Sequence, residues 1–179
     1  TANLAMTLTK MGYRVGILAA DIYGPSQPKT WGVEEFVPPL IQLEGDDTEW
    51  MGPAESQGVS IMSIGFFIKP SDALVWRGPM AVNALRQMIN QTGWGELDFL
   101  LIDMPPGTGD VPLTVFQSIP LSGVVVVSTP QDLVGMIVRK AVNMAGMMNI
   151  PVLGLVENMA YVQCPHCDEK IYPYGQGNT

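Results

Sequence analysis

The chain has 179 residues, of which 47% are hydrophobic and 15% are charged, and its formal net charge is −8. This length and composition predict one globular domain over residues 1–179 and exclude a disordered chain. The negative charge argues against a nucleic-acid partner, which needs a basic surface, and no apolar run reaches the length of a membrane span.

The N-terminal part alternates a helix, a strand and a long irregular segment. Residues 2–12 predict a helix that ends at a glycine, and residues 13–19 predict a short apolar strand that delivers Asp21 to the following loop. Residues 27–58 are rich in proline, glycine and acids, and we interpret them as an irregular excursion with room for a short edge hairpin. Because the chain begins within a helix, we expect a first strand before Thr1.

The rest of the chain alternates strand patterns with helix patterns. Strands are predicted over residues 59–64, 99–103, 123–128 and 151–156, and helices from Pro79, after Asp110 and over about residues 132–148. Strands that alternate with helices are typical of βαβ units. We therefore expect an α/β fold with a mostly parallel sheet flanked by helices.

One strand ends in a carboxylate that is followed by two prolines and two glycines. The four apolar residues over 99–102 run without alternation, as in a strand buried on both faces, and Asp103 ends the run. Open α/β sheets bind ligands at the carboxyl ends of their strands, and nucleotide-hydrolysing folds hold magnesium with an aspartate at this position. The alternative is that Asp103 only caps an ordinary turn.

Polar residues follow three of the predicted strands, at Asp21, over residues 103–110 and at Asn158. In a parallel sheet the loops after these strands emerge at the same edge. This convergence favours a nucleotide site over a simple turn cap.

Several motifs resemble, in the same order along the chain, those of the Mrp/ApbC family. They are DIYGPS at 21–26, WRGPM at 76–80, DMPPGTGD at 103–110, STPQ at 128–131, ENM at 157–159 and CPHC at 164–167. Members of this family are SIMIBI-like P-loop NTPases related to the nitrogenase iron protein and to Min-type ATPases, and they are implicated in carrying iron–sulfur clusters. The resemblance covers essentially the whole chain and implies the same fold.

The resemblance also implies a role for each matching residue. Asp21 corresponds to the switch I aspartate that positions the attacking water, and Asp103 to the Walker B aspartate that holds Mg²⁺ through its water shell. Gly107 and Asp110 belong to switch II, where a glycine N–H can reach the γ-phosphate. Asn158 resembles the asparagine that recognises adenine through its amide. The implied cofactors of this site are ATP and Mg²⁺.

The two cysteines of the chain lie three residues apart, at Cys164 and Cys167, within a segment over 159–177 that we interpret as a metal loop. Two thiolates complete neither a zinc site nor a cubane cluster, which take four ligands. The motif alone favours zinc first, with an iron–sulfur cluster and a redox dithiol as alternatives, and His166 is badly placed to bind the same metal. The family resemblance implies a [4Fe–4S] cluster bridging the cysteine pairs of a homodimer.

The chain departs from the family pattern in three ways. The glycine-rich phosphate-binding loop is not found, and we expect it upstream of Thr1, together with any targeting peptide. The family's Asp-Ala-Asp is replaced by Ala19-Ala20-Asp21, which weakens the inference of ATP hydrolysis but keeps the acid that positions water. The family continues with a helical segment where this chain ends at Thr179.

The sequence therefore predicts an ATP-binding scaffold and carrier that passes a [4Fe–4S] cluster to apo iron–sulfur proteins as a homodimer, with slow ATP hydrolysis as a switch. We expect it in the cytoplasm, with an organelle matrix as the alternative, and without nucleic-acid or membrane partners. One rival function is a Min- or Par-type positioning ATPase, which does not need the cysteine pair. The other is a zinc-binding adaptor.

Overall fold

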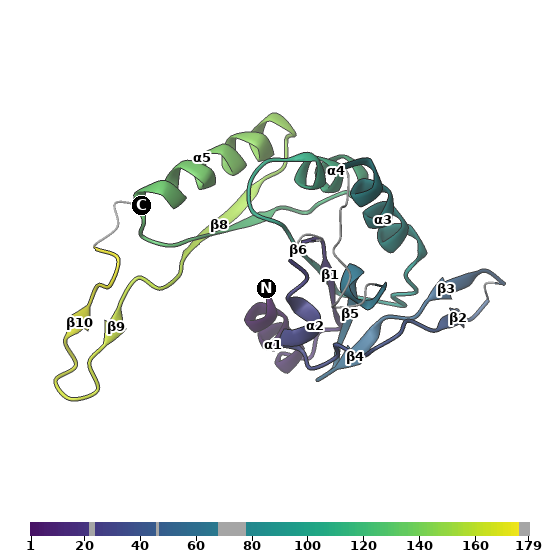
Figure 1. Ribbon diagram of the computed structural model, residues 1–179. Coiled ribbons are helices and arrows are strands. Elements are labelled where there is room, and N and C mark those ends of the chain that lie inside the picture. Colours follow the sequence, from purple (N-terminus) through teal and green to yellow (C-terminus); the bar gives the residue numbers. More distant parts are fainter. Residues whose placement is uncertain (22–23, 46, 68–77, 176–179) are drawn as a thin grey trace. The chain divides into compact units, whose positions relative to one another are not determined.

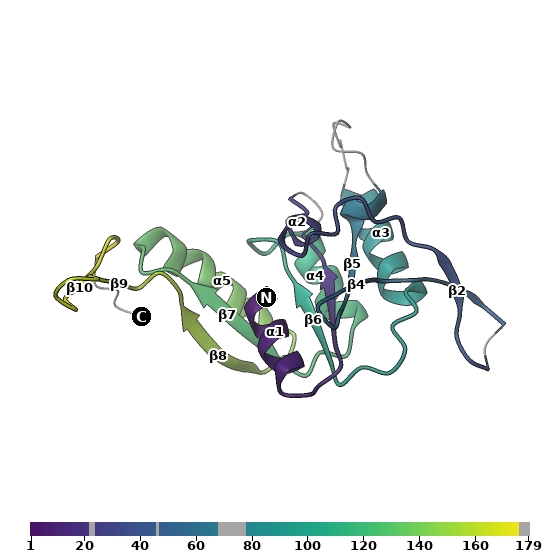
Figure 2. The same cartoon turned by 90° about the horizontal axis from the view of Figure 1, so that it is seen from below.

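The chain folds as two units, each with its own sheet and helices: unit 1 (Thr1–Pro106) and unit 2 (Gly107–Thr179). The computed structural model describes residues 1–21, 24–45, 47–67 and 78–175. Figures 1 and 2 show the elements of both units in two views.

Among the residues that the structure describes, unit 1 holds most of the strands and three α-helices. Its elements are α1 (Ala2–Lys10), β1 (Val15–Ala19), α2 (Gln27–Thr30), β2 (Leu40–Gln42), β3 (Glu49–Met51), β4 (Ala54–Ser56), β5 (Val59–Ser63), the 3₁₀ turn η1 (Ile64–Phe67), α3 (Gly78–Gln91) and β6 (Phe99–Asp103). The helices expected near residues 2–12 and from Pro79 are present, as are the first three predicted strands.

The sheet of unit 1 has the strand order β4-β5-β1-β6. β1 is parallel to both β5 and β6, so that Ala19 lies beside Ser63 on one side and Asp103 on the other. All five residues of β1 are buried, since it has a strand on each side and α1 packs against it. Its uninterrupted apolar sequence suits this central position.

The prediction that residues 99–102 form a strand buried on both faces is wrong for unit 1. β6 is an edge strand of this sheet, with β1 as its neighbour. Its first residues, Phe99 and Leu100, are 40% and 37% exposed. Burial of a strand depends on what lies beside it, and a run of four apolar residues does not specify that.

Residues 27–58 form α2, a hairpin of β2 and β3, and β4. The hairpin strands pair antiparallel over three residues each, and Figure 2 shows them extending beyond the main sheet. β4 pairs antiparallel with β5 and closes the other edge of the sheet.

Unit 2 contains two helices, a parallel strand pair and a small hairpin. Its elements are α4 (Asp110–Ser118), β7 (Val124–Ser128), α5 (Asp132–Met147), β8 (Val152–Glu157), β9 (Val162–Gln163) and β10 (Lys170–Ile171). β7 and β8 pair in parallel, and α5 packs along them (Figure 1). β9 and β10 pair antiparallel in a separate hairpin.

The predicted α/β fold with mostly parallel strands and flanking helices is confirmed. β5, β1 and β6 are parallel in unit 1, as are β7 and β8 in unit 2. Right-handed crossovers through helices are the usual connections of such strands. None of the described helices combines the length and apolar composition needed to cross a membrane.

Candidate nucleotide and metal sites

Asp103 and Asp21 lie where two neighbouring parallel strands of unit 1, β6 and β1, reach their carboxyl ends. Asp103 is the last residue of β6 and sits beside Ala19, the last residue of β1. The backbone N–H groups of Ala20 and Asp21 both donate to the carbonyl oxygen of Asp103, at 2.9 and 3.1 Å. These two hydrogen bonds fix the start of the loop after β1 to the end of β6. The expected meeting of strand ends is therefore present for these two acids.

The carboxylate of Asp103 is held on both oxygens. Its Oδ1 accepts a hydrogen bond from the hydroxyl of Thr1, and its Oδ2 accepts one from Nε2 of Gln27 at 2.7 Å. Gln27 is buried, with 6% of its surface exposed, and its Oε1 accepts a hydrogen bond from the indole N–H of Trp31 at 3.0 Å. The side chain that touches Asp103 is thus itself anchored in the core of unit 1.

Asp21 holds its own loop. Its Oδ1 accepts a hydrogen bond from the backbone N–H of Gly24 at 3.2 Å, a local turn that aspartate commonly forms. Residues 22 and 23 of the predicted switch I motif lie outside the described residues. The half-buried carboxylate of Asp21 therefore stands at the mouth of the loop that follows β1.

The predicted switch II residues begin unit 2. Gly107 has φ +93°, a conformation that glycine adopts without strain. Asp110 is exposed and is the first residue of α4, where a negative charge also favours the positive end of the helix dipole. A structural role of Asp110 at the helix start is therefore compatible with a role near phosphate.

Asn158 follows β8 directly. Its backbone N–H donates to the carbonyl oxygen of Ser128 at 2.7 Å, so the carboxyl ends of β7 and β8 are joined there. Its side-chain Oδ1 accepts a hydrogen bond from the N–H of Met159 at 3.0 Å. The exposed amide of Asn158 therefore lies at the carboxyl end of the β7–β8 pair, next to Ser128, the last residue of β7.

The predicted nucleotide residues are thus divided between the two units. Asp21 and Asp103 meet in unit 1, whereas Gly107, Asp110 and Asn158 belong to unit 2. The first two residues of the predicted motif at 76–80 lie outside the described residues, and α3 begins at its third.

The residues present at Asp103 fit a magnesium ion that is shared with phosphate and water. Among the described residues, no group of three or more His, Cys, Asp and Glu could enclose a metal. Mg²⁺ usually keeps several waters and takes one or two carboxylates plus substrate phosphates. A carboxylate has roughly four lone-pair sites, so Asp103 can accept hydrogen bonds from such waters besides those from Thr1 and Gln27.

The cysteine pair lies in the turn between β9 and β10. The N–H of Cys164 donates to the carbonyl oxygen of Glu169 at 2.9 Å, and the N–H of Asp168 donates to the carbonyl oxygen of Cys164 at 3.1 Å. Gln163 also donates from its amide to the carboxylate of Asp168 at 3.1 Å. These bonds fold the segment back on itself and present both cysteines from one small turn.

The turn stabilises a thiolate at its first cysteine. Hydrogen bonds from the backbone N–H groups of His166 and Cys167, together with the Cys167 side chain, lower the pKa of Cys164 below its ordinary value of 9.0. Both cysteines are free, and Cys167 is exposed. Since the thiolate is the form that binds metals, this turn suits a metal or an iron–sulfur cluster.

The structure also shows two features that the sequence did not reveal. One is Gln27, which contacts Asp103 across 76 positions of the chain, and no local pattern signals such a contact. The other is the β9–β10 hairpin around the cysteines. Its strands have two residues each, which is too short for a strand pattern to be recognised in the sequence.

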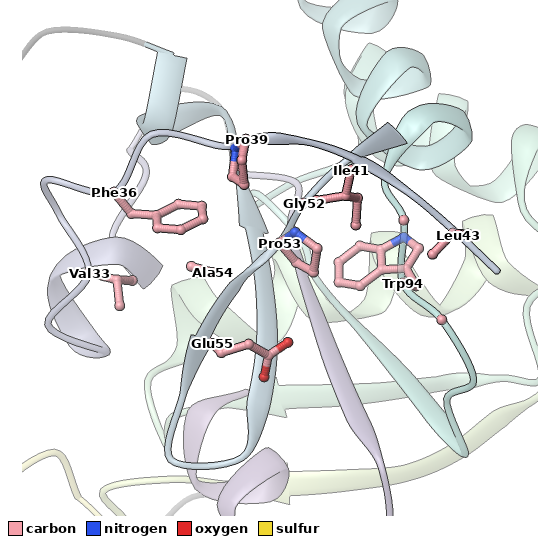
Figure 3. A pocket seen from close by; sticks show the side chains of 12 residues that line it. Val33, Phe36, Pro39, Ile41, Leu43, Gly52, Pro53, Ala54, Glu55 and Trp94 are labelled. Atoms are coloured by element: carbon pink, nitrogen blue, oxygen red, sulfur yellow. The ribbon is translucent and has the colours of Figure 1, made fainter. Parts of the chain in front are cut away.

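Unit 1 also contains an apolar pocket of about 540 Å³, shown in Figure 3. Phe36, Ile41, Pro53 and Trp94 contribute to its lining, and among the described lining residues Glu55 alone is charged. Neither Asp21 nor Asp103 lines it. The pocket is thus separate from the two acids that the sequence singled out, and the candidate nucleotide site stays at the carboxyl ends of β1 and β6.

Comparison with known families identifies the family of the chain. The model of the ParA family described as NUBPL iron-transfer P-loop NTPase matches residues 1–179. The chain belongs to this family. The resemblance drawn from the motifs is thereby confirmed, and so is the P-loop NTPase fold.

Individual members of the family and related structures agree with this assignment. An iron-sulfur cluster carrier protein from Pseudomonas fragi is 49% identical, over 98% of this chain and 60% of that protein. A nucleotide-binding protein from Archaeoglobus fulgidus, solved in complex with ADP, is 42% identical with a TM-score of 0.81, covering 98% of this chain and 66% of that one. The MinD cell division protein of Aquifex aeolicus shares the fold, at 16% identity and a TM-score of 0.53, over 83% of this chain and 57% of that one.

The chain spans between 47% and 64% of the length of eight of the curated relatives that it matches. Family membership and fold are therefore established for residues 1–179. The activity and the partners of the whole protein belong to the proposal that follows from these observations.

Proposed function

We propose that this protein binds ATP with Mg²⁺ and carries a [4Fe–4S] cluster, as a homodimer, to apo iron–sulfur proteins. The observation that carries the proposal is the Cys164–Cys167 turn, whose backbone N–H groups lower the pKa of Cys164, in a chain that belongs to an iron-transfer NTPase family. Positioning ATPases of the Min or Par type do not need such a turn.

The carboxylates of unit 1 supply the magnesium side of the nucleotide site. Asp103 would accept hydrogen bonds from waters of a Mg²⁺ ion, which neutralises phosphate charge when it is bound. Asp21 would orient the attacking water from the loop after β1. Orientation alone makes few demands on the basicity of Asp21, because phosphoryl transfer depends mainly on positioning and charge neutralisation.

Three residues of unit 2 have the chemistry for further nucleotide contacts. Gly107 would donate its N–H to the γ-phosphate, and its positive φ lets the backbone approach closely. Asp110 would lie in the same switch segment. The amide of Asn158, with both a donor and an acceptor, would recognise adenine.

The cluster is the cargo of the protein. A [4Fe–4S] cluster takes four cysteine thiolates, and each chain offers Cys164 and Cys167. A two-fold axis that places two β9–β10 turns face to face would complete the ligand set. The homodimer is therefore part of the cluster site.

Slow ATP hydrolysis would act as a switch on cluster transfer. Asn158 and Cys164 are separated by only six positions within unit 2, so nucleotide contacts at Asn158 can bias the turn that holds the cysteines. We place this cycle in the cytoplasm, with apo-proteins as recipients and no nucleic acid or membrane as partner. The net charge of −8 agrees with the absence of a nucleic-acid partner.

The test is anaerobic purification of the whole protein, followed by iron, sulfide and zinc analysis and by calorimetry of ADP binding. We expect iron and sulfide in equal amounts and a broad visible absorbance. The double variant Cys164→Ala/Cys167→Ala should lose the iron and sulfide and keep its ADP affinity. Zinc without iron in the wild type, or loss of ADP binding together with the metal, would contradict the proposal.

A further inference from the structure

A buried glutamine links the loop after β1 to the carboxylate at the end of β6. Gln27 opens α2, directly after the loop that begins at Asp21, and its Nε2 donates to Oδ2 of Asp103 at 2.7 Å. The backbone of the same loop already holds the Asp103 carbonyl oxygen, through the N–H groups of Ala20 and Asp21. The loop and α2 therefore contact both the main chain and the side chain of Asp103.

The amide of Gln27 has only one orientation that satisfies its partners. The indole N–H of Trp31 can only donate, and an ionised carboxylate can only accept. Oε1 must therefore face Trp31, at 3.0 Å, and Nε2 must face Asp103. Gln27 and Trp31 are both 6% exposed, so water competes little for these two bonds.

The short helix α2 holds Gln27 and Trp31 in register. The N–H of Trp31 donates to the carbonyl oxygen of Gln27 at 3.0 Å, which sets the two side chains on the same face, four residues apart. Pro28, in the first turn, is buried and has a fixed φ. The amide of Gln27 that donates to Asp103 is therefore carried by a short helix whose position is fixed by buried residues.

We propose that Gln27 is a positioning residue for the magnesium-binding carboxylate, holding Asp103 in the rotamer in which its free lone pairs meet the waters of Mg²⁺. This inference rests on the proposed Mg²⁺ site at Asp103. Gln27 itself touches neither the metal nor the nucleotide in this role. It acts through Asp103, and Trp31 acts through Gln27.

The test measures the Mg²⁺ dependence of ADP binding to the whole protein by calorimetry, in EDTA and over a series of MgCl₂ concentrations. Gln27→Met keeps the length of the side chain and removes its donor. Trp31→Phe keeps Gln27 and removes its anchor, at a smaller risk to folding. Gln87→Met changes an exposed glutamine of α3 and serves as the matched control.

We expect Gln27→Met to raise the Mg²⁺ concentration of half-maximal effect about tenfold, equivalent to about 1.4 kcal/mol, as for loss of a hydrogen bond to a charged group. Trp31→Phe should raise this Mg²⁺ concentration about threefold, because the Gln27 amide keeps its hydrogen bond to Asp103 but loses the one from the indole N–H. Gln87→Met should leave it unchanged. ADP affinity in EDTA should be the same in all four proteins.

Two results would overturn the role of Gln27 and leave the proposed magnesium site standing. One is an unchanged Mg²⁺ midpoint in both Gln27→Met and Trp31→Phe. The other is a loss of ADP affinity in EDTA, which would show that Gln27 contacts the nucleotide directly. A lowered melting temperature with an unchanged midpoint would assign Gln27 a purely structural role and has the same consequence. If ADP binding by the wild type did not respond to Mg²⁺, the proposed magnesium site would fall, and the inference with it.

Discussion

Asp103 accepts hydrogen bonds on both of its carboxylate oxygens, from Thr1 and from Gln27. A carboxylate that is held in this way keeps one orientation, which is what a metal-bound water shell requires. Ala19, the residue of β1 that pairs with Asp103, carries no acid of its own. In the proposed site, the role of holding Mg²⁺ through its waters therefore falls to Asp103, and Asp21 keeps the role of orienting the attacking water.

Replacing Asp103 by Asn tests its role in holding Mg²⁺. The amide keeps the size of the side chain and removes its negative charge, so Mg²⁺ should no longer strengthen nucleotide binding. We expect ADP affinity at saturating Mg²⁺ to fall by about tenfold or more, as when a charged hydrogen-bonding partner is removed. Calorimetry in EDTA should give the same affinity for the variant and the wild type. A variant that responds to Mg²⁺ as the wild type does would exclude Asp103 as the metal-binding residue.

The pKa of Cys164 gives a second test at this scale. Because N–H groups stabilise its thiolate, alkylation of Cys164 by iodoacetamide should reach half its maximal rate at a lower pH in the folded apo-protein than in urea. His166→Pro removes one of these donors and should move the midpoint to higher pH. His166→Ala keeps the N–H and should leave the midpoint in place.

Mass spectrometry of the peptide that contains Cys164 follows the reaction of this one residue. If His166→Ala and His166→Pro shift the midpoint equally, the imidazole and not the backbone N–H controls the thiolate. That outcome would contradict the geometry of the turn.

Residues that follow the ends of parallel strands could be predicted to lie close together, and contacts made from elsewhere in the chain could not. The meeting of Asp21 and Asp103 follows from the rule that parallel strands end at one edge. Gln27 was missed because it lies in α2 and not at a strand end, and only the folded loop after β1 brings its amide to the carboxylate of Asp103. Its sequence neighbours, a proline on each side of a Ser-Gln pair, indicate a turn and nothing more.

At the scale of elements, β1 is the strand on which unit 1 depends. Its central position requires close packing on both faces, and at Gly16 there is no room for a side chain. A Cβ placed there would lie 2.6 Å from Cδ1 of Leu97 and 3.1 Å from atoms of Leu100 and Trp94. The segment that leads from α3 into β6 therefore packs directly on the backbone of β1.

Gly16→Val should destabilise the protein by about 1–3 kcal/mol, because the added methyl groups force Leu97 and Trp94 out of their packed positions. Gly146→Ala is the control: nothing lies near its Cβ in α5, and alanine favours a helix by about 0.5–1 kcal/mol. Urea unfolding measures both variants. Equal stability of Gly16→Val and wild type would mean that this packing is loose.

The elements themselves were predictable where the apolar pattern was long enough. Strands β1, β5, β7 and β8 follow from apolar runs, and α3 and α5 from helical spacing. The hairpin of β9 and β10 was not predicted, since its strands have two residues each and its turn is set by hydrogen bonds to Cys164. The exposure of Phe99 and Leu100 at the start of β6 depends on which elements cover the strand, and the sequence of the strand alone does not specify that.

At the scale of the whole molecule, the proposed cluster site links the cargo to the assembly. Two cysteines per chain make half of a [4Fe–4S] site, so the proposed cargo and the proposed homodimer require each other.

Removing the cluster should therefore shift the protein from dimer to monomer when nucleotide is absent. Anaerobic size-exclusion chromatography with light scattering, before and after treatment with a strong iron chelator, measures the shift. Adding iron and sulfide back should restore the dimer. The double variant Cys164→Ala/Cys167→Ala should remain a monomer throughout, and a dimer of that variant would show that the cluster is not what joins the chains.

Native mass spectrometry of the anaerobically reconstituted whole protein tests the central claim most directly. We predict a species with the mass of two chains and one [4Fe–4S] cluster, which is absent when Cys164 and Cys167 are replaced by Ala. Single chains that each carry a zinc ion, or dimers that hold no iron and sulfide, would contradict the account.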